Sequence, residues 1–309
     1  MTRYISTFLL LGVISATIFF LGCTTKPSKQ VPEEKITISK VTVPFRPDEQ
    51  PLCVSLTEDE TFIVYQSPRS DGHGALDLWY SRFEDGKWSE TYNAGPNINS
   101  SSNEADGKFS HDGKSMVFVR SDDFSKSTEL YISYLEGDSW TKAAPIGPPV
   151  SLPDTREFGA NFSHDGTKLY FSSNREGGEG GMDHYYSERS GQTWGEPVNL
   201  GPGINTEENE NDLTISLDEK TIVFAKEKPE SIEGSMDLYF SQFTEGSWSP
   251  IQNLGSEINS PGNDSCAWFG HNGTSLYFNS DWDYDLGKIA EPRNGKHGLV
   301  WKATNPKGF

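Results

Sequence analysis

Acidic side chains recur at matched places along this chain, and their spacing is the strongest candidate for chemistry that the sequence offers. Four of them stand eight residues before a repeated turn, at Glu104, Glu157, Glu210 and Asp264, and two more follow, at Asp106 and Asp212. Grouped carboxylate oxygens are the ligands that Ca²⁺ prefers in proteins. The first four residues therefore form a candidate calcium site, and all six belong to a predicted ligand-binding face.

A structural role explains the same pattern. An acid that precedes a strand can accept N–H bonds from its own loop, and a repeated chain copies such a cap from unit to unit. Under this alternative the carboxylates hold their loops in place and bind no ion. The outcome depends on the elements that position them.

The repeated turn defines those elements. Its polar residue stands at Asp59, Asp112, Asp165, Asp218 and Asn272, an interval of 53 or 54 residues. Short apolar runs flank it, an Asp-Gly pair suits a tight hairpin, and a tryptophan marks a fourth strand at Trp88, Trp140, Trp194 and Trp248. A period of this size that carries four short strands is typical of a propeller.

Five turns predict five four-stranded blades. The last blade lacks a fourth strand after Leu299–Ala303, whereas Ile36–Val43 is an alternating, β-branched segment with no partner ahead of the first unit. We expect this leading segment to complete the last blade as its outermost strand, because closure removes an open sheet edge. The predicted fold class is all-β, a five-bladed β-propeller over residues 35–309.

Residues 1–22 have the composition of a lipoprotein signal peptide. Arg3 precedes an apolar run, and Phe20-Leu-Gly-Cys23 is similar to a bacterial lipobox, with Phe20 where that motif usually has leucine. Cleavage ahead of Cys23 would make this residue the acylation site, with residues 23–34 as a polar tether. The alternative is an ordinary secretory signal in which Cys23 has no role.

Composition restricts the partners. The chain has 309 residues and a formal charge of −19, with 45 acidic against 26 basic residues. This balance argues against nucleic acid and against anionic membrane surfaces as partners. We expect membrane contact through the lipid anchor only, and a monomeric protein.

The repeat resembles a known family. Asn161-Phe-Ser-His-Asp-Gly166, Leu169-Tyr-Phe-Ser-Ser-Asn174 and Asn199-Leu-Gly-Pro-Gly-Ile204 are similar to the WD-like propeller repeat of the TolB family, which is abundant in bacterial envelope proteins. The resemblance covers about residues 50–303 and implies a propeller of the cell envelope. It does not carry an activity, because the matched residues are turn and packing positions.

Three further groups of residues are candidates. The loop Asp281–His297 interrupts the repeat, and insertions often mark a binding surface. Trp282, Tyr284 and Arg293 are therefore predicted to bind a glycan. The alternative is that the loop only covers the contact between the first and last blades.

Cys53 and Cys266 occupy matched positions in the first and last units, where a disulfide is one hypothesis. The sequence favours two buried thiols instead, because adjacent inner strands are expected to lie too far apart.

The histidines have less to support them. His111, His164 and His271 replace a proline that the resembled family usually has, and they are expected to be solvated turn residues. Closure would bring His73 close to His297, and His184 begins a third strand. Imidazoles near carboxylates can bind a transition metal or transfer protons, although nothing in the spacing requires either.

The predicted function is that of a lipid-anchored envelope propeller that binds a protein or a glycan, at the outer membrane and facing the periplasm. The alternative is a glycan-active enzyme, a glycoside hydrolase or lyase, because arabinanase-like five-bladed propellers carry acids in the central funnel. In that case Glu49, Glu104 and Glu157 are the catalytic candidates. Acids that repeat from blade to blade favour binding, since catalysis needs unlike acids in unlike surroundings.

Overall fold

The computed structural model describes residues 35–41, 43, 45, 51–57, 59–227, 236–270, 273–289, 299–305 and 308–309. All of them belong to one compact unit, Glu34–Phe309. None of the described segments is a helix that is long and apolar enough to cross a membrane. Several residues named above lie outside the described ranges, so their roles stay predictions: Arg3, Phe20, Cys23, Glu49, His271, Asn272, Arg293 and His297.

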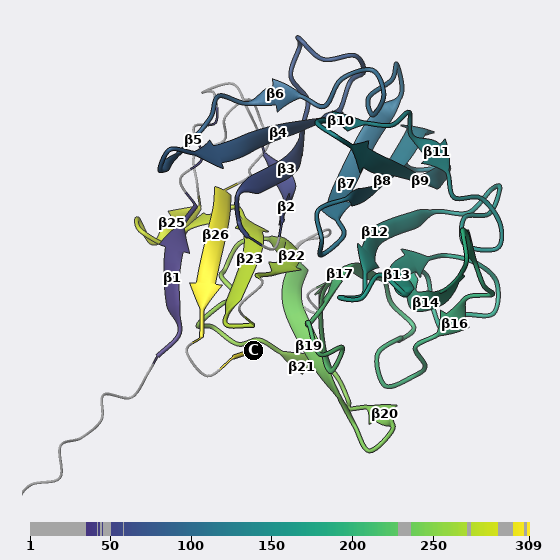
Figure 1. The fold of residues 1–309 in the computed structure, drawn as a ribbon. Helices are drawn as coiled ribbons and strands as arrows, with labels where there is room; N and C mark the ends of the chain where they lie inside the picture. Colours follow the sequence, from purple (N-terminus) through teal and green to yellow (C-terminus); the bar gives the residue numbers. More distant parts are fainter. Residues whose placement is uncertain are drawn as a thin grey trace, which may run out of the picture. The chain divides into compact units, whose positions relative to one another are not determined.

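Five antiparallel sheets stand around a central axis, which confirms the five-bladed propeller (Figure 1). The inner strands are β2 (Leu52–Leu56), β7 (Asn103–Phe109), β12 (Glu157–Phe162), β17 (Glu210–Ile215) and β22 (Asp264–Phe269). The second strands are β3 (Phe62–Ser67), β8 (Ser115–Asp123), β13 (Lys168–Ser173), β18 (Thr221–Glu227) and β23 (Ser275–Ser280). The third strands are β4 (Asp77–Glu84), β9 (Ser127–Glu136), β14 (Asp183–Ser190), β19 (Met236–Thr244) and β26 (Leu299–Thr304).

The fourth strand of blades 1 to 4 is divided into two short pieces that both pair with the third strand. These pieces are β5 (Lys87–Trp88) and β6 (Tyr92–Asn93), β10 (Ser139–Trp140) and β11 (Ala144–Pro145), β15 (Thr193–Trp194) and β16 (Val198–Asn199), and β20 (Ser247–Trp248) and β21 (Gln252–Asn253). The predicted tryptophans thus lie in the first piece. Blade 5 instead carries a small hairpin of β24 (Trp282–Asp283) and β25 (Lys288–Ile289).

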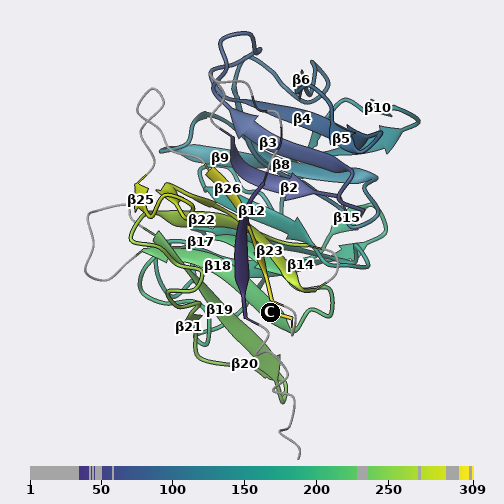
Figure 2. The same cartoon turned by 90° about the vertical axis from the view of Figure 1, so that its left-hand side faces the viewer.

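The N-terminal strand closes the ring. Strand β1 (Thr37–Lys40) pairs antiparallel with β26, from Thr37 opposite Thr304 to Lys40 opposite Trp301. The sheet order is β1-β26-β23-β22, so β1 is the outermost strand of blade 5, as Figure 2 shows beside the yellow β26. The predicted closure is confirmed, with a strand shorter than Ile36–Val43.

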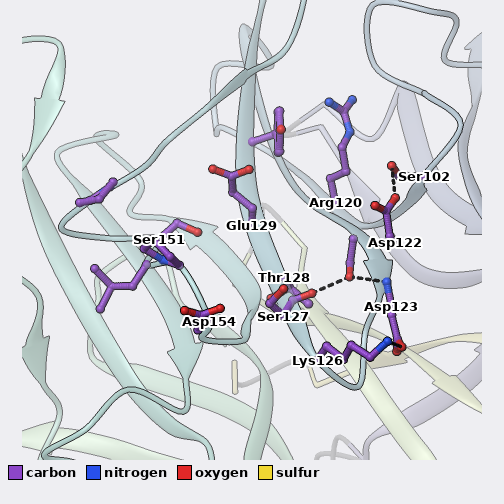
Figure 3. Close-up of a pocket in the computed structure, with 15 residues that line it drawn as sticks. Ser102, Arg120, Asp122, Asp123, Lys126, Ser127, Thr128, Glu129, Ser151 and Asp154 are labelled. Carbon is purple, nitrogen blue, oxygen red and sulfur yellow. Dashed lines mark hydrogen bonds and ion pairs between the residues drawn. The ribbon is translucent and has the colours of Figure 1, made fainter.

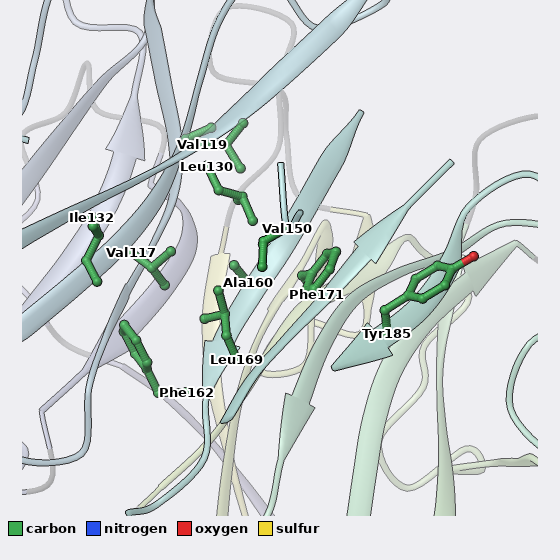
Figure 4. Close-up of a cluster of buried hydrophobic side chains, with 11 residues drawn as sticks. Val117, Val119, Leu130, Ile132, Val150, Ala160, Phe162, Leu169, Phe171 and Tyr185 are labelled. Carbon is green, nitrogen blue, oxygen red and sulfur yellow. The ribbon is translucent and has the colours of Figure 1, made fainter. Parts of the chain in front are cut away.

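The apolar residues lie mainly between neighbouring blades. Figure 4 shows one such cluster, in which Val117 and Leu130 of blade 2 face Leu169 and Phe171 of blade 3, with Val150 from the connecting segment between them. Val117, Leu169 and Phe171 lie on second strands and are fully buried. This explains why the sequence is apolar on both faces of these strands.

The repeated turn has the expected chemistry. Asp165 accepts hydrogen bonds from the Ser163 hydroxyl at 2.8 Å and from the Thr167 amide at 2.9 Å. Gly166 follows with φ 70°, a backbone conformation that suits glycine. Hydrogen bonds from Thr167 lower the pKa of Asp165 to about 2. The Asp-Gly turn is therefore a structural device of the hairpin.

Candidate functional site

A β-bulge at one level of each inner strand shapes the axis of the propeller. The pairing register shifts at this level in all five blades. The residue there has a positive φ each time: Cys53 48°, Asp106 51°, Gly159 58°, Asp212 52° and Cys266 52°. A Cβ on Gly159 would lie 3.0 Å from the Cα of Asp212, so a side chain here would require the Asp212 backbone to shift.

The structure joins Cys53 and Cys266 in a disulfide, which corrects the preference for two free thiols. Their Cα atoms are 4.7 Å apart, within the range that the bond requires. The bulges explain the difference, because they move both residues out of the regular strand path. No residue pattern in the sequence indicates a bulge at a cysteine.

The four repeated carboxylates are buried within their blades. Glu104 accepts hydrogen bonds from the Ser100 amide and hydroxyl, Glu210 from the same groups of Thr206, and Asp264 from those of Ser260. Glu157 accepts from the hydroxyls of Ser151, Thr155 and Ser173.

These contacts match the capping alternative, in which each acid holds its own loop. Burial nevertheless raises the pKa of Glu104, Glu157 and Glu210. Their proposed roles in binding calcium or a ligand stay predictions.

A pocket of about 540 Å³ opens between blades 2 and 3 (Figure 3). Its walls come from the β8–β9 hairpin and from the loop that enters β12, two loops of the face on which the sequence placed ligand binding. Four acidic and two basic side chains line it, together with several hydroxyls: Asp122, Asp123, Glu129, Asp154, Arg120, Lys126, Ser102, Ser121, Ser127, Thr128 and Ser151.

Arg120 is the fixed cation of this pocket. Its Nε donates to Glu104 Oε1 at 2.7 Å, and its Nη2 donates to the Ile98 carbonyl at 2.7 Å. The guanidinium also lies over the ring of Tyr131, with 4.1 Å from Cζ to the ring centroid. One repeated carboxylate is thereby linked to the pocket, because Glu104 is the counter-charge of Arg120.

Glu129 makes blade 2 different from blades 1 and 4. Asp77 and Asp237 stand at its position in blades 1 and 4, where Asn93 and Asn253 donate to them. Blade 2 has Pro145 at the position of these asparagines, so Glu129 lacks that donor. Figure 3 shows Glu129 beside Arg120, its pairing partner across β8 and β9, facing the pocket.

Sequence reasoning missed Arg120, Glu129 and Tyr131. Glu129 and Tyr131 stand at repeated positions of the third strand, where they are expected to serve the blade itself. The pocket that they line arises where one blade departs from the repeat. An aligned comparison of the five units, position by position, would have exposed Pro145 and Glu129 as the exceptions.

Two of the three predicted glycan-binding residues, Trp282 and Tyr284, are described, and they differ in how they pack. Tyr284 is packed edge-to-face against Phe278 and Trp301, with ring centroids 6.0 and 5.0 Å away, and its hydroxyl donates to the Ile258 carbonyl. Trp282 is half-buried in the β24–β25 hairpin. Stacking on a sugar thus stays a prediction for Trp282, whereas the Tyr284 ring is part of the blade core.

The histidines lie in three different settings. His111 and His164 contact each other edge-to-face, with ring centroids 3.7 Å apart, and both line one small pocket on the hairpin side. His73 is exposed. His184 is fully buried, with its Nδ1 2.9 Å from the Ser172 hydroxyl, and burial lowers its pKa to about 3. It is therefore a neutral core residue.

Comparisons with known proteins identify the fold. No family model and no curated protein matches the chain. TolB from Acinetobacter baumannii is similar with a TM-score of 0.51 and 18% identity, over 84% of this chain and 55% of that one. A putative TolB from Agrobacterium tumefaciens has a TM-score of 0.52 and 16% identity, over 87% and 90%.

A third similar structure is an enzyme. An α-L-arabinofuranosidase from Lactobacillus brevis has a TM-score of 0.53 and 14% identity, over 84% of this chain and 93% of that one. At these identities the likeness concerns the propeller fold alone. The chain spans about half the length of the Acinetobacter TolB, 55%.

Proposed function

We propose that this chain is a binding module of the bacterial cell envelope whose ligand is a basic segment of an envelope protein. The observation that carries the proposal is the pocket between blades 2 and 3, where four carboxylates outnumber two cations. Glu129 and Asp154 offer carboxylate oxygens to an arginine or lysine side chain, and the hydroxyls around them accept or donate to a peptide backbone.

The location in the cell rests on the N-terminal sequence. Phe20-Leu-Gly-Cys23 is similar to a lipobox, and the propeller fold is shared with TolB proteins. We propose an anchor acylated on Cys23, with a fatty acid such as palmitate, at the outer membrane and facing the periplasm. Metabolic labelling with a palmitate analogue tests it, because Cys23→Ser should abolish the label.

A binding experiment tests the ligand. The full-length chain is titrated with three fluorescent probes of equal length or mass, which are an arginine- and lysine-rich peptide, a glutamate-rich peptide and a neutral oligosaccharide. We expect binding of the basic peptide that weakens with salt. The double variant Glu129→Gln/Asp154→Asn should weaken it about tenfold, equivalent to about 1.4 kcal/mol.

A surface control is Glu84→Gln, which removes one charge from an exposed site on the opposite face, whereas the double variant removes two. Binding should be unchanged in this variant. Equal loss in Glu84→Gln would mean that only net charge matters, and preferential binding of the oligosaccharide would replace a protein ligand with a glycan.

A glycan-active enzyme is the second candidate, and Asp212 is the observation that favours it. Burial, followed by the charge of Asp106, raises the pKa of Asp212 to about 7, a property of acid catalysts. Release of sugar by the wild type but not by Asp212→Asn would establish the enzyme.

A further inference from the structure

Four of the five residues at the inner bulges carry atoms that bind metal ions. The Sγ atoms of Cys53 and Cys266 and one carboxylate oxygen each of Asp106 and Asp212 all lie within 4.8 Å of one another. The fifth position is Gly159, whose lack of a side chain lets the Asp212 backbone come close. Residues from blades 1, 2, 4 and 5 therefore meet at one point on the axis.

Hydrogen bonds from neighbouring blades hold this group in place. The Cys53 amide donates to Asn279 Oδ1 at 2.9 Å, and the Asp106 amide donates to Gln66 Oε1 at 2.7 Å. The Gly159 amide lies 3.3 Å from Asp106 Oδ2, and Cys266 Sγ lies 3.6 Å from Asp212 Oδ2. The ligand atoms are thus positioned by the fold before any ion arrives.

Two acidic side chains of this group are accompanied by one ammonium group. Asp106 is buried, Asp212 is only partly exposed, and one ammonium group, that of the buried Lys108, accompanies the two carboxylates. Lys108 Nζ lies 5.4 Å from the centroid of the Trp268 ring and donates no hydrogen bond to a described residue. When both acids are ionised, two carboxylates and one ammonium carry a net negative charge, which a bound cation would offset.

We propose that the reduced form of this protein binds one divalent cation of the zinc class at the axis, with Cys53, Cys266, Asp106 and Asp212 as its four ligands. Two thiolates and two carboxylates suit tetrahedral Zn²⁺, which has Zn–S distances of about 2.3 Å and Zn–O distances of about 2.0–2.2 Å. A tetrahedron with such bonds places its ligand atoms roughly 3.3–3.8 Å apart. The four ligand atoms lie within 4.8 Å of one another, and breaking the S–S bond would let the two sulfurs separate to this distance.

The disulfide and the metal site exclude each other. A dithiol reductant transfers two electrons and two protons to the Cys53–Cys266 bond and becomes a cyclic disulfide. The cation then replaces the two thiol protons, and the bound ion takes the place of the covalent cross-link between blades 1 and 5. The partial exposure of Asp212 gives the ion a route from solvent.

Cobalt absorption tests the proposal, because Co²⁺ bound by thiolates gives an intense sulfur-to-metal band that carboxylates alone do not give. The protein is the full-length chain with Cys23→Ser, in mild detergent, so that Cys53 and Cys266 are the only cysteines among the three of the sequence. We expect one Co²⁺ per chain after reduction with a phosphine, displacement by Zn²⁺, and a melting temperature that the ion restores toward that of the oxidised protein.

Two controls make the result decisive. The oxidised protein should show no thiolate band, and reduced Asp106→Asn/Asp212→Asn should bind Co²⁺ at least about tenfold more weakly. This variant retains both cysteines, so its oxidised form checks folding through its melting temperature. Absence of a band in the reduced protein would overturn the proposal. So would an undiminished affinity in the double aspartate variant, because thiolates alone would then hold the ion.

Discussion

Lys40 lies opposite Trp301 in the pairing of β1 with β26, and its ammonium group stands 5.7 Å from the centroid of the Trp301 ring. The first and the last strand of the described chain thus pair in one sheet, and the side chain of Trp301 in β26 is fully buried. The propeller is held closed by a segment that precedes its first blade.

This closure predicts a strong effect from the inner side of β1. Ile38 packs against the apolar cluster between blades 4 and 5, whereas Ser39 is exposed. Ile38→Asp should cost about 2 kcal/mol of unfolding free energy, because a half-buried apolar side chain is replaced by a charge. Ser39→Asp is the matched control and should change it by less than about 0.5 kcal/mol. Urea denaturation measures both.

Removing the whole segment is the more severe test. Deletion of residues 35–45 should expose the edge of β26 and unfold all five blades in one transition, because every inner strand contacts the next around the ring. Circular dichroism on heating would show this. A truncated protein with the stability of the wild type would contradict the closing role of β1.

The disulfide at the axis should stabilise the contact between blades 1 and 5, because it joins Cys53 to Cys266. It joins residues 213 positions apart, so it restricts the unfolded chain strongly. Cys53→Ser/Cys266→Ser should lower the unfolding free energy by about 2–5 kcal/mol in metal-free buffer. Thiol labelling under denaturing conditions provides the independent check. The unreduced wild type should label two cysteines fewer than the reduced protein.

The buried ion pair of blade 2 predicts an asymmetric result. Glu104 is fully buried and Arg120 is its cation, at 2.7 Å. Arg120→Ala should cost about 3–5 kcal/mol, since it leaves an uncompensated buried carboxylate. Lys126→Ala removes a cation from the same pocket whose side chain is 79% exposed, and it should be nearly neutral. Equal effects of the two variants in urea denaturation would contradict this account.

Much of the fold could be predicted because it depends on residue types at repeated positions. Asp165 and Gly166 specify a hairpin wherever they occur, and a two-faced apolar strand such as Leu169–Phe171 must lie inside a blade. The spare segment at Ile36–Val43 and the missing strand after Leu299–Ala303 then determined the closure. None of these inferences needed a distance between residues far apart in the sequence.

The candidate site could be predicted only in part, because it depends on exceptions. The pocket of Arg120 and Glu129 exists where Pro145 interrupts a pattern kept in other blades. The meeting of Cys53 with Cys266 depends on bulges with positive φ, a conformation that the identity of a cysteine does not announce. Repetition reveals what the blades share, whereas binding surfaces arise where they differ.

Calcium should have little effect on this protein. Glu104, Glu157, Glu210 and Asp264 each accept several hydrogen bonds from their own blade, and an ion would have to displace these donors. We expect millimolar Ca²⁺ to leave the melting temperature of the oxidised protein unchanged. A rise that saturates with Ca²⁺ and disappears in Glu157→Gln would instead establish the carboxylate ring as a calcium site.

His184 should make the propeller sensitive to mild acid. Its pKa falls from 6.5 to about 3 in the folded protein because the imidazole is buried, so between these values the unfolded chain binds the additional proton. Stability therefore decreases as the pH falls from 6.5 toward 3, by up to about 1.4 kcal/mol per pH unit from this residue. His184→Gln should flatten the slope of unfolding free energy against pH, although it lowers stability at neutral pH. His73→Gln changes an exposed histidine and should leave the slope as it is. Parallel slopes for the wild type and His184→Gln would show that the acid sensitivity comes from other groups.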